Sequence, residues 1–361
     1  ADMDFMPPPC IQEAICTYVK ANPLGYTMTN PKYLEAVINW YKRRHNCILS
    51  KDWLTSAPNV ITGIMWCIAA FTKTNDVIAV LTPVYGAFDA SASDAKRPII
   101  AVPMNRNEDN RYSVDYSAFE AAIVKHDVKV FIHCNPHNPV GHVWNEDEMD
   151  QLFSICKRHG VLIISDEIHQ DLVTGPLSFT SALTVSNGAY ANNIIAMSSL
   201  SKSFNMASLH HAEVIIPNED LRRQYNVCKG LVYHTDSDVI AEAAITAAYT
   251  HAEAEMWLMD LLALVKENYE YMCSHLLQAL PELRISPMDG TYLAWIDFGA
   301  YVKAEDMHDV FENQCGIAPS FGEWFGGESY ATFVRLNLAT SLENIKIATN
   351  RIIQHVHPSH K

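Results

Sequence analysis

Short apolar segments alternate with amphipathic segments between about residues 75 and 216. Six of the apolar segments carry apolar residues at mostly consecutive positions, which is typical of strands that are covered on both faces. They are residues 77–81, 99–102, 128–134, 161–165, 194–197 and 214–216. Between them, residues 117–125 and 146–159 carry apolar side chains three and four positions apart, which predicts helices. This alternation predicts an α/β fold with a mostly parallel sheet.

A different pattern begins after residue 237 and predicts a smaller α+β domain. A helical stretch rich in Ala, Glu and Leu extends to about Ala279, and alternating segments at residues 292–298 and 333–338 predict strands. Helical patterns at residues 304–315 and 342–355 lie on either side of the second strand. The length of 361 residues agrees with two domains, at about 150 residues each.

The composition is that of a globular protein, and the net charge limits the classes of partner that it can bind. Apolar residues make up 49% of the chain and charged residues 19%, which excludes disordered and fibrous classes. The net charge of −15 repels nucleic acid and anionic lipid, so we expect a small-molecule or protein partner instead. We expect no membrane span, because the longest apolar run, Val60–Phe71, is shorter than the ~18 residues that a spanning helix needs.

Cysteine usage indicates a reducing compartment. The nine cysteines are odd in number and include no C-x-x-C pair, which is typical of free thiols. We therefore expect a cytoplasmic protein. The acidic start, Ala1 to Asp4, does not match a signal peptide, and the absence of an initial Met leads us to expect that an N-terminal segment is missing.

Polar groups follow four of the predicted strands, at the edge where ligands bind in open α/β sheets. Tyr85 follows the first strand, Asn138 the third and Asp166 the fourth. Lys202 follows the fifth strand and has serines around it. These groups suit pyridoxal phosphate: a lysine forms a Schiff base, a carboxylate holds the ring nitrogen protonated, an aromatic ring stacks on the pyridine, and hydroxyls bind the phosphate.

Each residue also has a purely structural interpretation. Asn138 could be a turn residue, Tyr85 a core aromatic ring and Lys202 a solvated charge. Their joint occurrence at strand ends favours the cofactor site. We expect no metal site at His133 and His137, because His137 falls in a turn and no carboxylate or further cysteine accompanies the pair.

Several motifs resemble the fold-type I pyridoxal-phosphate enzymes of the class I/II aminotransferase superfamily. They are most similar to the MalY/PatB-like branch of cystathionine β-lyases and cysteine C–S lyases. The motifs are NPHNPVGHVW at residues 135–144, SDEIHQDL at 165–172, SKSFN at 201–205, GYT at 25–27, GTYLAWIDF at 290–298 and FVRLNLA at 333–339. The resemblance therefore covers essentially the whole chain.

The resemblance implies an aspartate aminotransferase-like fold with two domains. The large cofactor-binding domain would comprise residues 25–245 and contain a mostly parallel sheet of the seven-stranded type. The small α+β domain would combine residues 1–24 with residues 246–361. The resemblance also implies a homodimer with shared active sites, in which Tyr26 reaches the cofactor phosphate of the neighbouring subunit.

The resemblance further implies a role for each cofactor-binding residue. Lys202 would form the Schiff base and move a proton at the substrate α-carbon, and Asp166 would hold the pyridine nitrogen. Asn138 would bind the ring hydroxyl, and Tyr85 would stack on the ring. The phosphate would lie at a helix start. Its partners would be the backbone N–H groups of Val60 and Ile61 and the hydroxyls of Ser199 and Ser201.

The implied reaction is α,β-elimination of cystathionine or cysteine-type amino acids to homocysteine or hydrogen sulfide, pyruvate and ammonia. Arg335 would bind the substrate α-carboxylate, because a planar guanidinium suits a carboxylate. Tyr26 would also contact the substrate. His169, beside the cofactor, stands where related aminotransferases carry Tyr, which favours the lyase branch. The alternatives are an aminotransferase and a cofactor-binding protein that regulates a protein partner.

Three positions depart from the family pattern. His210 stands where aminotransferases carry a phosphate-binding Arg, which leads us to expect weaker or pH-dependent phosphate binding. Gly86 replaces an aromatic residue or His, so we expect a larger substrate pocket or the loss of an acid–base group. Asn59 replaces Gly before the phosphate-binding pair, and we expect it to be tolerated because Asn accepts left-handed backbone angles.

Overall fold

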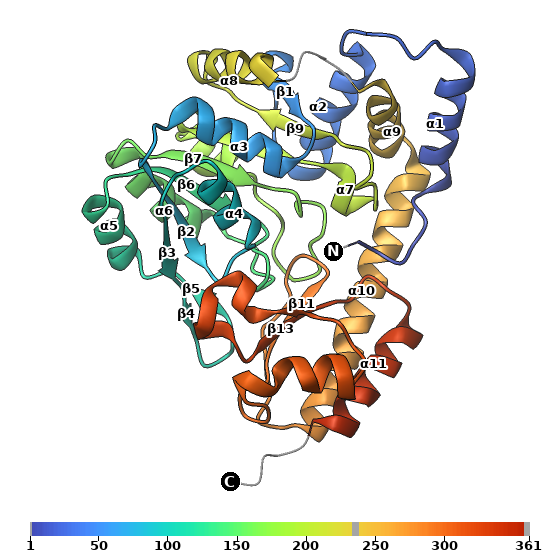
Figure 1. Cartoon of the computed structure of the whole chain (residues 1–361). Helices are drawn as coiled ribbons and strands as arrows, with labels where there is room; N and C mark the ends of the chain where they lie inside the picture. The colour runs from blue at the N-terminus through green and yellow to red at the C-terminus, as the bar shows by residue number, and fades with distance from the viewer. Residues whose placement is uncertain (1, 233–237, 357–361) are drawn as a thin grey trace.

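The computed structural model describes residues 2–232 and 238–356 (Figure 1). A seven-stranded sheet forms its centre. In spatial order the strands are β1 (Leu54–Ala57), β9 (Ala212–Ile215), β8 (Ile194–Ser198), β7 (Leu162–Asp166), β6 (Val128–Cys134), β2 (Val77–Thr82) and β3 (Ile99–Pro103). β9 pairs antiparallel with both neighbours, and the other strands run parallel to one another. The predicted α/β class and mostly parallel sheet are confirmed.

Helices cover both faces of this sheet. One face is covered by α3 (Val60–Phe71), α4 (Ala87–Asp94) and α8 (Glu219–Val232), and the other by α2 (Pro31–His45), α5 (Tyr116–Lys125), α6 (Glu146–Arg158) and α9 (Val239–Thr250). Phe131 of β6 packs in the core with Trp40 of α2, whereas its neighbour Ile132 packs in the core with Ile64 of α3. Because both faces are covered, consecutive residues of these strands are apolar.

The structure confirms the six predicted strands, with bounds that differ by at most two residues. It adds β1, whose residues Thr55 and Ser56 are polar and only partly buried at the edge of the sheet. The single long helix expected after residue 237 is wrong, because His251 is extended and separates α9 from α10 (Ala252–Ala279). The expected start at residue 237 lies outside the described residues.

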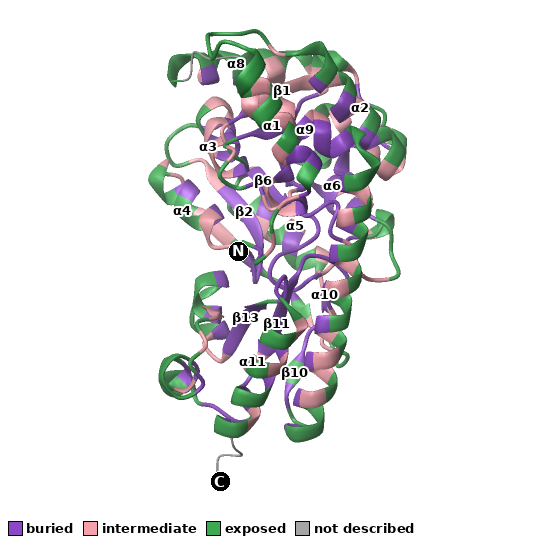
Figure 2. Cartoon of the chain, turned by 90° about the vertical axis from the view of Figure 1, so that its right-hand side faces the viewer, coloured by how far each residue is buried: buried purple, intermediate pink, exposed green. Residues whose placement is uncertain are grey.

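The smaller part of the molecule is a four-stranded antiparallel sheet. Its order is β10 (Arg284–Ile285), β11 (Leu293–Asp297), β13 (Phe333–Asn337) and β12 (Ser320–Phe321), and α10 and α11 (Leu342–His355) pack together beside it. The two predicted strands of this part are confirmed. The expected helix at residues 304–315 forms a 3₁₀ turn at Ala304–Asp306 and a π-helical segment at Asp309–Gln314. Figure 2 shows that α10 and α11 are buried on their inner faces and exposed outside.

The remaining elements connect these parts. They are α1 (Pro9–Ala21), β4 (Asn105–Arg106), β5 (Tyr112–Ser113), α7 (Leu200–Ser203) and short 3₁₀ turns at Lys51–Trp53, Ala182–Gly188, Ala191–Asn193, Gly322–Phe325 and Gly327–Tyr330. The small sheet lies beyond the carboxyl ends of β2 and β6 (Figure 1). In the described ranges, no helix has the length and apolar character needed to cross a membrane.

Candidate active site

A cavity of about 190 Å³ lies at the carboxyl ends of β6, β7 and β8, beside the small sheet. It brings together most of the residues singled out in the sequence: Val60, Ile61, Tyr85, Asn138, Asp166, His169, Ser199, Ser201, Lys202 and Arg335. Tyr26 is not among its lining residues. It lies on the extended segment between α1 and α2, with 98% of its surface exposed.

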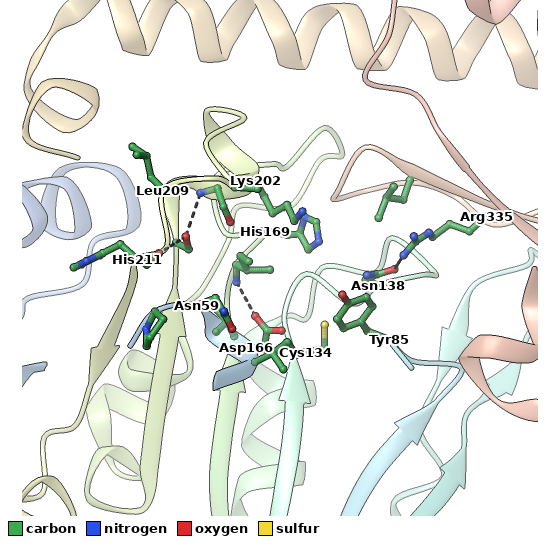
Figure 3. Close-up of a pocket in the computed structure, with 18 residues that line it drawn as sticks. Asn59, Tyr85, Cys134, Asn138, Asp166, His169, Lys202, Leu209, His211 and Arg335 are labelled. Carbon is green, nitrogen blue, oxygen red and sulfur yellow. Dashed lines mark hydrogen bonds between the residues drawn. The ribbon is translucent and has the colours of Figure 1, made fainter. Parts of the chain in front are cut away.

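The lining residues divide the cavity into two ends (Figure 3). Asn59 and His211 lie at one end, and Tyr85, Asn138 and Arg335 lie at the other. Lys202, His169 and Asp166 lie between these ends. The cavity therefore separates a helix start and hydroxyl groups from a guanidinium and an aromatic ring.

Asp166, the last residue of β7, is a buried carboxyl group at the floor of the cavity. Its Oδ1 accepts a hydrogen bond of 3.1 Å from the backbone N–H of Ile168. Burial raises the pKa of Asp166 to about 7, because water is excluded from the ionised form. A carboxylate in such a place is stabilised by a cationic N–H donor, and the protonated ring nitrogen of pyridoxal phosphate is such a donor.

Lys202 lies on α7, a single helical turn that hydrogen bonds of Ser199 and Ser203 hold in place. The Ser199 side chain caps this turn, accepting from Ser201 N at 3.2 Å and donating to the carbonyl oxygen of His211 at 2.7 Å. Ser203 Oγ donates to Asp171 Oδ2 at 2.7 Å. Burial lowers the pKa of Lys202, which increases the fraction of neutral amine. A neutral lysine amine serves as a nucleophile or as a base.

Asp171 anchors this turn to α2. Its Oδ1 accepts hydrogen bonds from Trp40 Nε1 at 3.1 Å, from Arg44 Nε at 3.1 Å and from His45 Nε2 at 2.9 Å. Burial opposes ionisation of Asp171, but the hydrogen bond from His45 and the nearby Arg44 outweigh it, so the pKa lies below its ordinary value. The backbone that carries Lys202 is thus fixed by a buried, ionised carboxylate.

The amino end of α3 fits a phosphate group. Val60 and Ile61 begin the helix, and Ser199 and Ser201 line the same cavity. Unpaired N–H groups and the helix dipole favour an anion at such an end. Asn59 caps α3, its side chain accepting from Thr62 N at 2.8 Å. The expectation of a left-handed Asn59 is wrong, because its φ of −164° is extended, as an N-cap requires.

Arg335, on β13 of the small sheet, is almost fully buried and points into the cavity (Figure 3). Its Nη1 donates to Asn138 Oδ1 at 2.9 Å and its Nη2 to Ser320 Oγ at 3.0 Å. The Phe325 ring lies 4.8 Å from the guanidinium carbon. Burial lowers the pKa of Arg335 to about 10, so the guanidinium remains charged at neutral pH. A charged fork at the cavity wall is suited to a carboxylate.

Tyr85 presents its ring to the same end of the cavity. It meets Phe88 edge-on at 5.8 Å and Trp324 edge-on at 4.9 Å between ring centroids. Burial raises its pKa, so the hydroxyl stays protonated at neutral pH. The two edge contacts fix the plane of the ring.

The histidines differ from the expectations. His210, expected near the phosphate, is exposed and is not among the cavity-lining residues, whereas His211 is buried, lines the cavity and bonds Tyr33 Oη through Nε2 at 2.9 Å. The sequence interpretation missed His211 because it did not recognise β9 as antiparallel. In an antiparallel strand the amino end lies at the edge where the parallel strands have their carboxyl ends, and His211 directly precedes β9. Burial lowers the pKa of His169 well below its ordinary value, and His169 Nδ1 is buried without a hydrogen-bond partner in the described structure.

His133 and His137 are held by protein groups. His133 Nδ1 lies 3.2 Å from Ser165 Oγ, and His137 Nε2 lies 2.9 Å from the carbonyl oxygen of Pro83. Within residues 2–232 and 238–356, no three His, Cys, Asp or Glu side chains gather as a metal site would require.

The comparison with protein families decides where the chain belongs. The family model of aminotransferase class I and II matches residues 2–352. The chain belongs to this family. The expected resemblance to the class I/II aminotransferase superfamily is thereby confirmed.

Relatives and solved structures place the chain near carbon–sulfur lyases. Cystathionine beta-lyase PatB of Bacillus subtilis is 30% identical over 98% of this chain and 90% of its own. Protein MalY of Escherichia coli is 32% identical over 93% and 85%. The structure of cystalysin from Treponema denticola, which contains pyridoxal 5′-phosphate, matches with a TM-score of 0.94 at 28% identity, over 98% and 89%. The pyridoxal-phosphate-bound C–S lyase of Staphylococcus hominis matches with a TM-score of 0.92 at 28% identity, over 99% and 90%.

Proposed function

We propose that this protein is a pyridoxal-phosphate-dependent carbon–sulfur lyase that acts on cystathionine or cysteine-type amino acids. The observation that carries the proposal is one cavity that combines a half-buried lysine of lowered pKa, a buried carboxyl group and a buried guanidinium. Relatives named cystathionine beta-lyase, aligned over nearly the whole chain, support this choice of reaction.

The residues that would hold the cofactor follow from their chemistry. The start of α3, with the N–H groups of Val60 and Ile61, would bind the phosphate together with Ser199 and Ser201. Asp166 would bind the protonated ring nitrogen, and Asn138 would bind the ring hydroxyl. Tyr85 would cover one face of the ring, and His169 would lie beside it. When bound, pyridoxal phosphate supplies an electron sink for the pair left at the substrate α-carbon.

The chain itself supplies binding and proton transfer. Arg335 binds the α-carboxylate and so orients the substrate. Lys202 Nζ, whose pKa is lowered by burial, removes the proton from the α-carbon. The Cβ–S bond then breaks, and its electron pair leaves with the sulfur. With one water consumed, the products are a thiol, pyruvate and ammonium.

The test is an absorbance scan of the cofactor-loaded protein from 300 to 500 nm, before and after L-cystathionine is added, with pyruvate assayed in the same sample. A Schiff-base band that changes while pyruvate appears is the expected result. A spectral change with no pyruvate, accompanied by a 2-oxo acid from the whole substrate, would indicate an aminotransferase instead.

We also propose a homodimer with shared sites. The segment between α1 and α2 is extended, and its apolar side chains Leu24, Tyr26 and Met28 are 61%, 98% and 86% exposed. Such a segment is stabilised when a partner covers it. Tyr26 would then reach the phosphate and the substrate in the partner's cavity. Light scattering of Tyr26→Ala and of the unmodified chain tests the assembly.

The domain division and the compartment are proposals of the same kind. Residues 25–245 would form the large domain, and residues 1–24 with 246–361 the small one. The two separate sheets support this division, while the packing of α1 on α9 joins the two units. The nine free cysteines support a cytoplasmic location.

A further inference from the structure

Gly86 lies directly under Trp324. A Cβ atom at position 86 would lie 2.2 Å from the carbonyl oxygen of Trp324 and 2.8 Å from its ring atom Cε2. The backbone of Gly86 is helical, with φ −63° and ψ −16°, so its conformation does not require glycine. The close approach of Trp324 does require glycine at position 86. The position of the indole therefore depends on the absence of a Cβ atom there.

The turn that carries Trp324 is fixed to the substrate end of the cavity. Phe325 accepts a hydrogen bond of 2.8 Å from Val84 N through its carbonyl oxygen, and its ring lies under the guanidinium of Arg335. Trp324 itself meets the rings of Tyr85 and Phe325 edge-on, at 4.9 and 5.0 Å. It is therefore adjacent to the two side chains that flank the proposed carboxylate site.

Trp324 adjoins the cavity through its contact with Tyr85, and much of its indole is exposed. Trp324 is 48% exposed although it is among the largest apolar side chains of the chain. An aromatic face of this kind is stabilised by an apolar group that covers it.

We propose that Trp324, seated over Gly86, is the specificity-determining residue at the substrate end of the cavity. It favours amino acids whose sulfur carries an aromatic or large apolar group over those whose sulfur carries a small one. The class of substrate in this proposal rests on the proposed lyase function. The choice of Trp324 rests on its contact with Gly86.

The test compares two substrates in pyruvate release by the loaded enzyme, S-phenyl-L-cysteine and S-methyl-L-cysteine. We expect Trp324→Ala to lower the ratio of their kcat/KM values about tenfold, the usual scale for one lost apolar contact surface. Gly86→Ala should lower the ratio similarly, because its Cβ would lie 2.2 Å from the Trp324 carbonyl oxygen and so displaces the turn that carries the indole. Trp324→Phe keeps an aromatic face and should retain most of the preference.

The double variant Gly86→Ala with Trp324→Ala provides the matched control. In Trp324→Ala the backbone carbonyl oxygen of residue 324 still lies close to position 86, but no indole remains for a shifted turn to move. The double variant should therefore have the same ratio as Trp324→Ala alone. Additive losses would overturn the assignment, because they would mean that position 86 acts independently of Trp324. An unchanged ratio in Trp324→Ala would overturn it as well.

A binding measurement separates this inference from the proposed reaction. L-homophenylalanine and L-2-aminobutyrate have no sulfur to expel, and calorimetry gives their dissociation constants for the loaded protein. Trp324→Ala should weaken L-homophenylalanine about tenfold more than L-2-aminobutyrate. If no sulfur amino acid yields pyruvate, the proposed reaction fails, and this difference in affinity still decides the role of Trp324. Equal affinity changes for both ligands would refute that role.

Discussion

Arg335 Nη1 and Asn138 Oδ1 are joined by a buried hydrogen bond of 2.9 Å. Arg335 belongs to β13 of the small sheet, and Asn138 follows β6 of the large sheet. The residue proposed to bind the substrate carboxylate and the residue proposed to bind the cofactor ring hydroxyl therefore contact each other across the two sheets. Substrate binding at Arg335 and cofactor binding at Asn138 therefore both depend on the relative position of the two sheets.

Replacing this guanidinium should affect substrate binding in particular. Arg335→Lys removes the planar fork but keeps a positive charge, and we expect kcat/KM for L-cystathionine to fall roughly 10- to 100-fold, mostly through a higher KM. Steady-state pyruvate release measures the change. Arg284→Lys, an exposed arginine on β10, should leave the kinetics unaltered. A loss confined to kcat would contradict a binding role for Arg335.

Lys202 should be indispensable for the reaction. Lys202→Ala removes the amine proposed to take the α-proton, and we expect pyruvate release to fall by at least ~10²-fold. Lys73→Ala, which removes an exposed lysine, is the control. The same assay should show no visible Schiff-base band for Lys202→Ala before substrate is added. Unchanged turnover in this variant would remove Lys202 from the mechanism.

Asn59 should stabilise α3 as its N-cap. Asn59→Ala removes the acceptor of Thr62 N–H and should lower the free energy of unfolding by ~1 kcal/mol, whereas Asn59→Gly should cost only a few tenths of that amount. Urea unfolding measures both variants. Affinity for pyridoxal phosphate should weaken in the same order, because the cap holds the first N–H groups of the helix in place. Equal losses for Ala and Gly would argue against the cap.

Glu213 makes the stability of the protein depend on pH. Both of its carboxyl oxygens are buried without a hydrogen-bond partner among the described residues, and burial raises its pKa to about 8. The folded state therefore holds a proton that the unfolded state has lost. Stability from this group is complete below pH ~4 and is lost as the pH rises towards 8. Urea unfolding between pH 5 and 8 should show a decline, and Glu213→Gln should flatten it by an amount on the order of a few kcal/mol.

The sequence pattern predicts the strands of the large sheet well because both faces are covered, so that burial appears as consecutive apolar residues. It also predicts that Tyr85, Asn138, Asp166 and Lys202 lie at one edge of the sheet. Each of them directly follows a strand, and the carboxyl ends of parallel strands share one edge. Trp324 could not be found this way. Its contact with Gly86 joins residues that are far apart in the chain, and neither lies in a periodic segment. The break at His251 was also missed, because one extended residue barely changes a helical pattern.

The helix α10 gives this architecture a mechanical property. Its 28 residues make a rod of about 42 Å that packs against α9 at one end and α11 at the other. The extended backbone of His251 is the joint between this rod and α9, which packs against α2 beside the large sheet. α10 thus spans the distance between the helices beside the large sheet and the small part of the molecule that carries Arg335 and Trp324.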